Sequence, residues 1–101
     1  MTTHTEAAAR FKALSDATRL RILGMLPAEG ELCACEILEA LDITQPTLSY
    51  HMKLLAAAGL VLARRDGIWM RYRLNGPALS DLRWYLDDLS ADRVGTDRCG
   101  C

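Results

Sequence analysis

The sequence predicts a mainly α-helical domain with one β-hairpin. Three observations support this prediction. Apolar residues recur at helical spacing through most of the chain, a short break at Asp42-Ile43 separates two helical segments, and Asp66-Gly67 separates two β-prone runs. The 101 residues suffice for one domain. Because a chain of this length buries only roughly 60% of its unfolded surface, dimerisation would stabilise it.

The first part of the chain is expected to form three helices. The second has Ser15-Asp16 as its N-cap, ends before Pro27, and directs Leu20 and Leu23 toward the core. A turn around Gly30 leads into the third. The three expected helices are residues 6–14, 17–26 and 31–41.

A fourth helix is expected from Thr44 to about Ala58. Thr44 is a good N-cap, and a proline in the first turn has no N–H to leave unpaired. Gly59 then serves as the C-cap glycine. An apolar face recurs at i, i+4 and i+7 and predicts which side of this helix meets the core; its members are Leu48, Met52 and Leu55.

The hairpin is expected over residues 60–74, because Asp-Gly between two β-prone runs is a strong hairpin signal. Trp69 and Tyr72 are interpreted as packing residues. Pro77 opens a last helix, whose apolar stripe would form a homodimer interface with the first helix; it comprises Leu79, Leu82, Leu86 and Leu89. The chain therefore divides into a folded domain, residues 1–89, and a flexible tail with two cysteines, residues 90–101.

The formal net charge of −1 conceals a local asymmetry. Residues 44–74 contain five Lys or Arg against Asp66 alone, whereas both flanking segments are acidic. The pI of about 6.1 is below the values above about 9 that are typical of small nucleic-acid-binding domains. Any nucleic-acid contact is therefore expected to be local to residues 44–74. An ordinary solvated surface is the alternative explanation of the same charges.

The order of the elements predicts a winged helix-turn-helix, which presents its fourth helix to the major groove of DNA and its hairpin to the phosphate backbone. Gln side chains can pair with adenine, whereas Ser, Tyr, Lys and Arg suit phosphates. The candidate DNA-contacting residues are Thr44, Gln45, Thr47, Ser49, Tyr50 and Lys53 in the helix and Arg64, Arg65 and Arg71 in the hairpin.

Three segments resemble the ArsR/SmtB family of metal-responsive repressors, and together they cover residues 10 to about 75. Residues 14–23, Leu-Ser-Asp-Ala-Thr-Arg-Leu-Arg-Ile-Leu, are similar to its second-helix signature. Residues 45–52, Gln-Pro-Thr-Leu-Ser-Tyr-His-Met, resemble its recognition helix, and residues 65–74 resemble its wing. The resemblance implies a homodimeric repressor that binds operator DNA without metal and releases it when metal binds.

Cys33 and Cys35 are the chemically most informative residues. Mid-helix, residues i and i+2 point about 200° apart, so two such thiols can share one ion only where the first turn is loose. Two buried structural cysteines are the alternative. The segment Glu31-Leu32-Cys33-Ala34-Cys35 resembles the family's thiolate box, which implies that arsenite or antimonite, or else cadmium or lead, is the inducer.

Some family members supply a third cysteine at the position of Leu38, so one thiolate for arsenite is missing here. Cys99 and Cys101 are the remaining candidates, in the same chain or the dimer mate; a terminus without a role is the alternative. The ten residues from Leu89 to Cys99 span roughly 17–19 Å as a flexible coil. Cadmium would instead take all four thiolates. The last helix offers carboxylates but no histidine, which disfavours zinc there.

Other functional classes receive less support. A thiol-redox regulator is one alternative, but the spacing is Cys-x-Cys rather than the Cys-x-x-Cys near a βαβ unit that is usual for such proteins. The chain has no phosphate loop and no nucleophile–base set, so we expect neither an enzyme nor an organic cofactor. No apolar run approaches the ~20 residues of a membrane span, and residues 1–10 contain no signal-peptide core. A cytoplasmic protein without a membrane partner is therefore expected.

Overall fold

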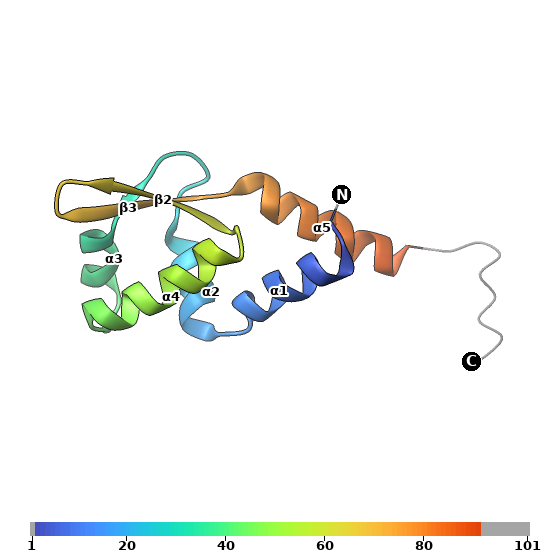
Figure 1. The fold of residues 1–101 in the computed structure, drawn as a ribbon, viewed down its shortest axis with the longest axis horizontal. Coiled ribbons are helices and arrows are strands. Elements are labelled where there is room, and N and C mark those ends of the chain that lie inside the picture. Colours follow the sequence, from blue (N-terminus) through green and yellow to red (C-terminus); the bar gives the residue numbers. More distant parts are fainter. Residues whose placement is uncertain (1, 92–101) are drawn as a thin grey trace.

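The computed structural model describes residues 2–91, which form five helices and a three-stranded antiparallel sheet. Figure 1 shows the sheet, α3 and α4 at one end of the molecule and α1 and α5 side by side at the other. In chain order the elements are α1 His4–Leu14, α2 Ala17–Met25, β1 Leu32–Cys33, α3 Ala34–Ala40, α4 Gln45–Ala57, β2 Val61–Asp66, β3 Trp69–Leu74 and α5 Gly76–Ser90. The mainly helical fold with a hairpin is confirmed.

The helix starts follow from side-chain caps. The Asp16 carboxylate accepts a hydrogen bond from the Arg19 N–H at 3.0 Å, and Thr44 accepts one from Thr47, as the sequence predicts. The expected start of α1 at residue 6 is two residues late. Thr3 and Glu6 form a reciprocal capping box there, so the helix begins at His4.

The predicted third helix is wrong at its start. Residues 32 and 33 form strand β1, which pairs with Tyr72 and Arg71 of β3, and α3 begins only at Ala34. Gly30 has a φ of 103°, which glycine adopts readily, and it makes the turn that precedes the strand. The partner of β1 lies about forty residues further along the chain, so local sequence gives little sign of this edge strand. The sheet order is β1-β3-β2.

The core lies between α2, α3, α4 and the base of the hairpin. The predicted α4 face is confirmed, since Leu48, Met52 and Leu55 are at most 2% exposed. The prediction for Leu20 is wrong, because it is 53% exposed while Ile22, about 200° away around α2, is fully buried. Buried His51 links α4 to α2: the Arg19 guanidinium donates to its Nδ1 at 3.1 Å.

The apolar stripe of α5 divides into two parts. Leu79 and Leu82 pack against the chain's own core, whereas Leu86 and Leu89 are more than half exposed, as is Trp84. The exposed apolar surface of α5 is therefore confined to its C-terminal half. Within residues 2–91, no helix is both long enough and apolar enough to cross a bilayer.

Candidate DNA-binding surface and thiol site

The outer side of α4 presents polar side chains to solvent. All six predicted α4 residues are exposed, namely Thr44, Gln45, Thr47, Ser49, Tyr50 and Lys53. The Thr44 hydroxyl also donates to the Thr47 hydroxyl at 2.9 Å, so these two residues fix the helix start as well as facing outward. This side of α4 can therefore approach another molecule without disturbing the core.

A groove of about 310 Å³ separates α4 from one face of the hairpin. Ser49 and Lys53 line it from the helix, and Arg65 lines it from the strand opposite. The hairpin side of the groove consists of two directly paired rows, Ala63 with Tyr72 and Arg65 with Met70. Directly opposed residues on antiparallel strands share a face, so Arg65 belongs to the face that meets α4.

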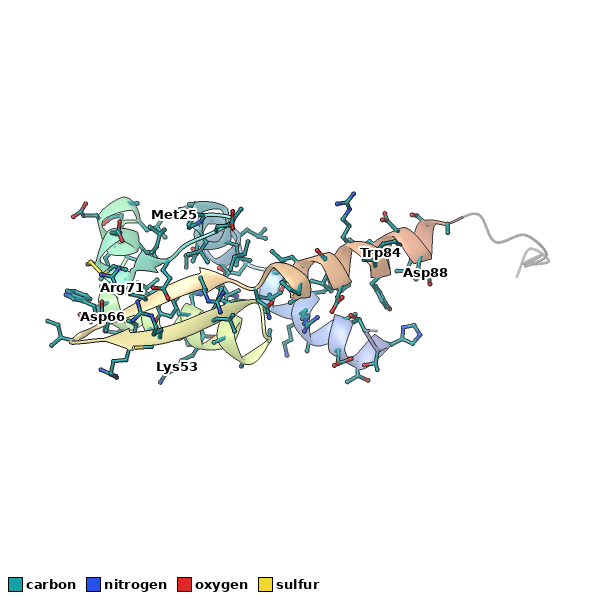
Figure 2. All side chains as sticks on the ribbon, turned by 90° about the horizontal axis from the view of Figure 1, so that it is seen from above. Met25, Lys53, Asp66, Arg71, Trp84 and Asp88 are labelled. Carbon is teal, nitrogen blue, oxygen red and sulfur yellow. A yellow bond between two sulfur atoms is a disulfide. The ribbon has the colours of Figure 1, made fainter. Side chains whose placement is uncertain are left out.

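Arg64 and Arg71 form another row and have carboxylate partners. Arg64 donates to both carboxylate oxygens of Glu31, at 3.0 and 2.6 Å, and Arg71 donates to Asp66 at 2.7 Å. The hydrogen bonds from Arg64 hold the pKa of Glu31 below its ordinary value, and that from Arg71 does the same to the pKa of Asp66. Figure 2 shows Asp66 and Arg71 on the side of the hairpin opposite to Lys53.

The thiol pair lies where β1 passes into α3. Cys33 is the N-cap of α3 and 4% exposed; its sulfur accepts a hydrogen bond from the Cys35 N–H at 3.1 Å. The two cysteines are joined by a disulfide. Because Cys33 precedes the helix, the opposed directions expected of i and i+2 mid-helix do not apply. Both sulfurs therefore reach the same point, as the thiolate-box resemblance requires.

The thiol segment is hydrogen-bonded to the hairpin. Cys33 pairs with Arg71 of β3, and Arg71 pairs with Arg64 of β2, so the three residues form one row across the sheet. Glu31, immediately before β1, holds the Arg64 guanidinium. No local pattern in the sequence predicts this role for Glu31. Alternation along β2 would have separated Arg64 from Arg65, but the Glu31 partnership depends on the unexpected strand β1.

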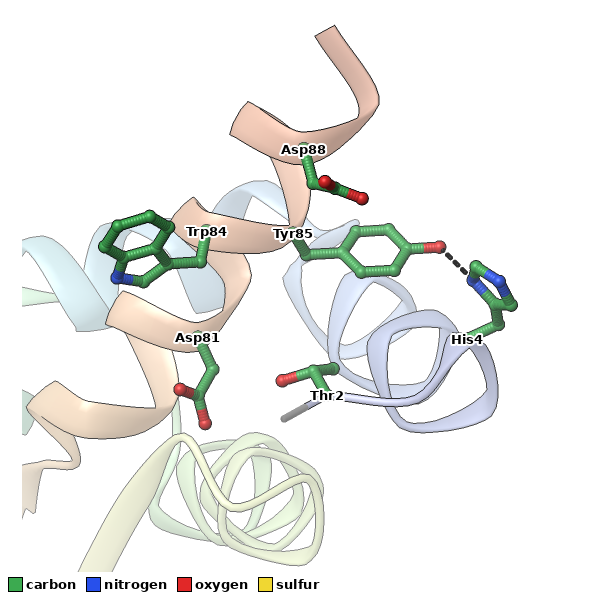
Figure 3. Close-up of a pocket in the computed structure, with 6 residues that line it drawn as sticks. All are labelled: Thr2, His4, Asp81, Trp84, Tyr85 and Asp88. Carbon is green, nitrogen blue, oxygen red and sulfur yellow. Dashed lines mark hydrogen bonds between the residues drawn. The ribbon is translucent and has the colours of Figure 1, made fainter. Parts of the chain in front are cut away.

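A second hollow, of about 500 Å³, lies at the opposite end of the molecule, between the start of α1 and α5 (Figure 3). His4 Nδ1 and the Tyr85 hydroxyl are hydrogen-bonded at 2.8 Å across it. Trp84 on its wall is 74% exposed. Nowhere in the part of the chain that the structure describes do three His, Cys, Asp or Glu side chains gather into a metal-binding group. Cys99 and Cys101 lie outside the described residues.

The fold and the polar helix beside a basic hairpin define a winged helix-turn-helix DNA-binding protein. Residues 16–62 match the family described as bacterial regulatory protein, arsR family. Over 98 residues the chain is 42% identical to the arsenical resistance operon repressor of Staphylococcus aureus, covering 97% of this chain and 90% of that protein. The chain therefore belongs to the ArsR family. This is a family of regulatory proteins, which confirms the prediction of a non-enzyme.

Solved structures agree with this assignment. An ArsR-like transcriptional regulator from Rhodococcus sp. RHA1 has a TM-score of 0.74 and 31% identity, over 85% of this chain and 80% of that one. The homodimeric winged helix-turn-helix domain of a possible ArsR-family regulator from Mycobacterium bovis has a TM-score of 0.67 and 31% identity, over 89% and 82%. The winged helix-turn-helix prediction is confirmed.

Proposed function

We propose that this protein is a homodimeric transcriptional repressor of the cytoplasm. It binds double-stranded operator DNA and releases it when Cys33 and Cys35, as thiolates, bind trivalent arsenic or antimony. The observation that most supports this proposal is the meeting of both sulfurs at one point between β1 and α3. The name of the Staphylococcus aureus relative, an arsenical resistance operon repressor, supports the choice of inducer.

DNA binding is assigned to α4 and to the hairpin face that meets it. Gln45, Ser49 and Tyr50 are exposed and suit base edges or nearby phosphates in the major groove. Lys53 and Arg65 line the groove between helix and hairpin, where they suit one phosphate strand. A homodimer would present two such surfaces to half-sites about one helical turn apart or a multiple of it.

Soft thiolate ligands suit the metalloid, but a disulfide offers none, so the inducer can bind only the reduced protein. Residues 2–91 supply two thiols at this point and no cluster of three ligands. We assign the third thiolate to Cys99 or Cys101. A chain truncated after Asp97 should then need roughly a hundredfold more arsenite, because a tethered thiol acts at about millimolar effective concentration. An equal requirement would eliminate the tail as ligand.

The test is the release of DNA measured by fluorescence anisotropy. The reduced protein, kept in a phosphine reductant, is bound to a duplex selected from a random-sequence pool and titrated with arsenite, antimonite, cadmium, lead and zinc. Release at the lowest concentrations by arsenite or antimonite, with three thiolates lost per ion, is expected. Four thiolates lost to cadmium or lead would favour the alternative inducers. DNA that stays bound in arsenite would contradict the proposal.

A thiol-redox regulator is the second candidate, and the disulfide between Cys33 and Cys35 is the observation that favours it. In that reaction the two thiols lose two electrons and two protons, and one hydrogen peroxide becomes two waters as the S–S bond forms. Peroxide is then the effective inducer. Release of DNA by peroxide but not by arsenite or cadmium would select this candidate over the first.

A further inference from the structure

We propose that the ion pair between Glu31 and Arg64 transmits ligand binding at the thiols to the hairpin. Arg64 is then a positioning residue of the release mechanism and not a phosphate contact. The inference rests on the proposed function, since it concerns how that function is regulated. Three observations support it: the face on which Arg64 lies, the geometry of the ion pair, and the connection of both partners to Cys33.

The first observation separates Arg64 from its neighbour Arg65. Successive residues of a strand point to opposite faces, and the groove beside α4 is lined by Arg65 but not by Arg64. Arg64 is instead opposite Arg71, whose guanidinium bonds to Asp66. The two adjacent arginines of β2 therefore have different surroundings, although the sequence alone gives them the same role.

The second observation is the form of the ion pair. Arg64 contacts Glu31 through two nitrogens, Nε and Nη2, which bond separately to the two carboxylate oxygens. Two parallel bonds of this kind fix orientation as well as distance. The Glu31 side chain is 24% exposed and the Arg64 side chain 56% exposed. The pair thus joins the loop before β1 to β2, the strand at the far edge of the sheet.

The third observation is that Glu31 and Cys33 stand at the two ends of one very short segment. Strand β1 contains only two residues, Leu32 and Cys33, and among residues 2–91 its one partner strand is β3. So short a strand offers few backbone hydrogen bonds to hold the hairpin when ligation shifts Cys33. The Glu31–Arg64 pair adds a second attachment, to β2, so β1 and both strands of the hairpin move together.

The consequence is a measurable change in coupling without a change in the DNA contacts. We define the release ratio as the dissociation constant for DNA with saturating arsenite divided by that without arsenite. This ratio cancels any effect of an altered charge on DNA affinity that is the same with and without arsenite. Removing the ion pair should lower the ratio, because the thiol segment can then shift while the hairpin stays in its DNA-binding position.

The experiment compares wild type with Glu31→Gln, Arg64→Gln and the double variant, as full-length reduced protein on the selected duplex. Glu29→Gln is the matched control, because it removes the same charge as Glu31→Gln from an exposed side chain two residues earlier in the chain, outside the proposed DNA-binding surface. We expect each single variant to lower the release ratio about threefold to fivefold, the factor of an exposed ion pair at the upper end of its usual strength. The double variant should lower it no further, and Glu29→Gln should leave it unchanged.

The results of this experiment distinguish a failure of the ion-pair link from a failure of the proposed function. Additive losses in the double variant, or equal losses in Glu29→Gln, would overturn the ion-pair link. A wild-type ratio above one that Glu31→Gln leaves intact overturns the link while the proposed function stands. A wild-type ratio of one removes both. Thermal unfolding followed by circular dichroism, expected to be unchanged in these surface variants, excludes misfolding as the cause of a lost response.

Discussion

The two faces of the β2–β3 hairpin differ in what surrounds their arginines. On the face toward α4, Arg65 lines a groove together with Lys53, and within residues 2–91 neither of these cations has an ion-pair partner. On the other face, Arg64 and Arg71 are each held by a carboxylate. Two of the basic residues counted in the sequence are therefore held in ion pairs in the folded chain. We propose that the cations beside α4, rather than these two, contact DNA.

The largest expected effect comes from removing a core side chain of α4, the helix that one face of the hairpin meets. Leu55 is fully buried on the core side of α4, so Leu55→Ala leaves a cavity and should lower the free energy of unfolding by about 2–5 kcal/mol. Urea denaturation followed by circular dichroism measures it. Leu54→Ala, at a position that is 36% exposed in the same helix, is the control with a smaller loss. Equal losses of unfolding free energy in the two variants would contradict the assignment of Leu55 to the core face of α4.

The next largest expected effect is on dimerisation through α5, at the end of the molecule away from the hairpin. Leu86 and Leu89 expose apolar surface on α5, and burying one leucine contributes about 1.5–3 kcal/mol. Leu86→Glu should therefore weaken the proposed dimer at least tenfold in sedimentation equilibrium. Leu62→Glu, an equally apolar exposed site on the hairpin, is the control and should leave association unchanged. A dimer that tolerates both changes is assembled through another surface.

One thiolate of the Cys33–Cys35 site can be removed without disturbing the fold. Serine is a favoured N-cap, so Cys33→Ser keeps the cap of α3 while removing a thiolate. This variant should bind DNA as wild type does and lose the response to arsenite, a coupling worth typically 5–150-fold. Cys35→Ser should behave in the same way. Anisotropy titration that finds wild-type release in either variant would assign the inducer site to other residues.

How far the sequence predicts this molecule depends on whether a feature is local. Caps and apolar spacing are local signals, and they predicted α2, the α4 face and the hairpin with small errors. The pairing of β1 with β3 joins residues far apart in the chain, so residues 32–33 were expected to be helical. The same strand places Glu31 beside Arg64, so the ion pair that distinguishes Arg64 from Arg65 cannot be predicted from local sequence.

The smallest expected effect is a titration on the hairpin. The bond from Arg71 lowers the pKa of Asp66, so this pair is complete at neutral pH and is lost only as the pH falls through the lowered value. Carbon-detected NMR of the carboxyl groups should find Asp66 titrating below 3.8, its ordinary value. Arg71→Gln should raise the Asp66 pKa and leave that of Asp16 in place. An Asp66 pKa that is the same in Arg71→Gln as in wild type would contradict the Arg71–Asp66 ion pair.

The division of the hairpin into two faces is tested most directly by the salt dependence of DNA binding in Arg64→Gln and Arg65→Gln. Each phosphate contact contributes about 0.9 to the slope of log affinity against log salt concentration. We predict that Arg65→Gln, which removes one contact from each protomer of the proposed dimer, makes this slope shallower by about 1.8, whereas Arg64→Gln keeps the wild-type slope. Equal loss of slope in both variants would contradict the account, because both arginines would then contact phosphate.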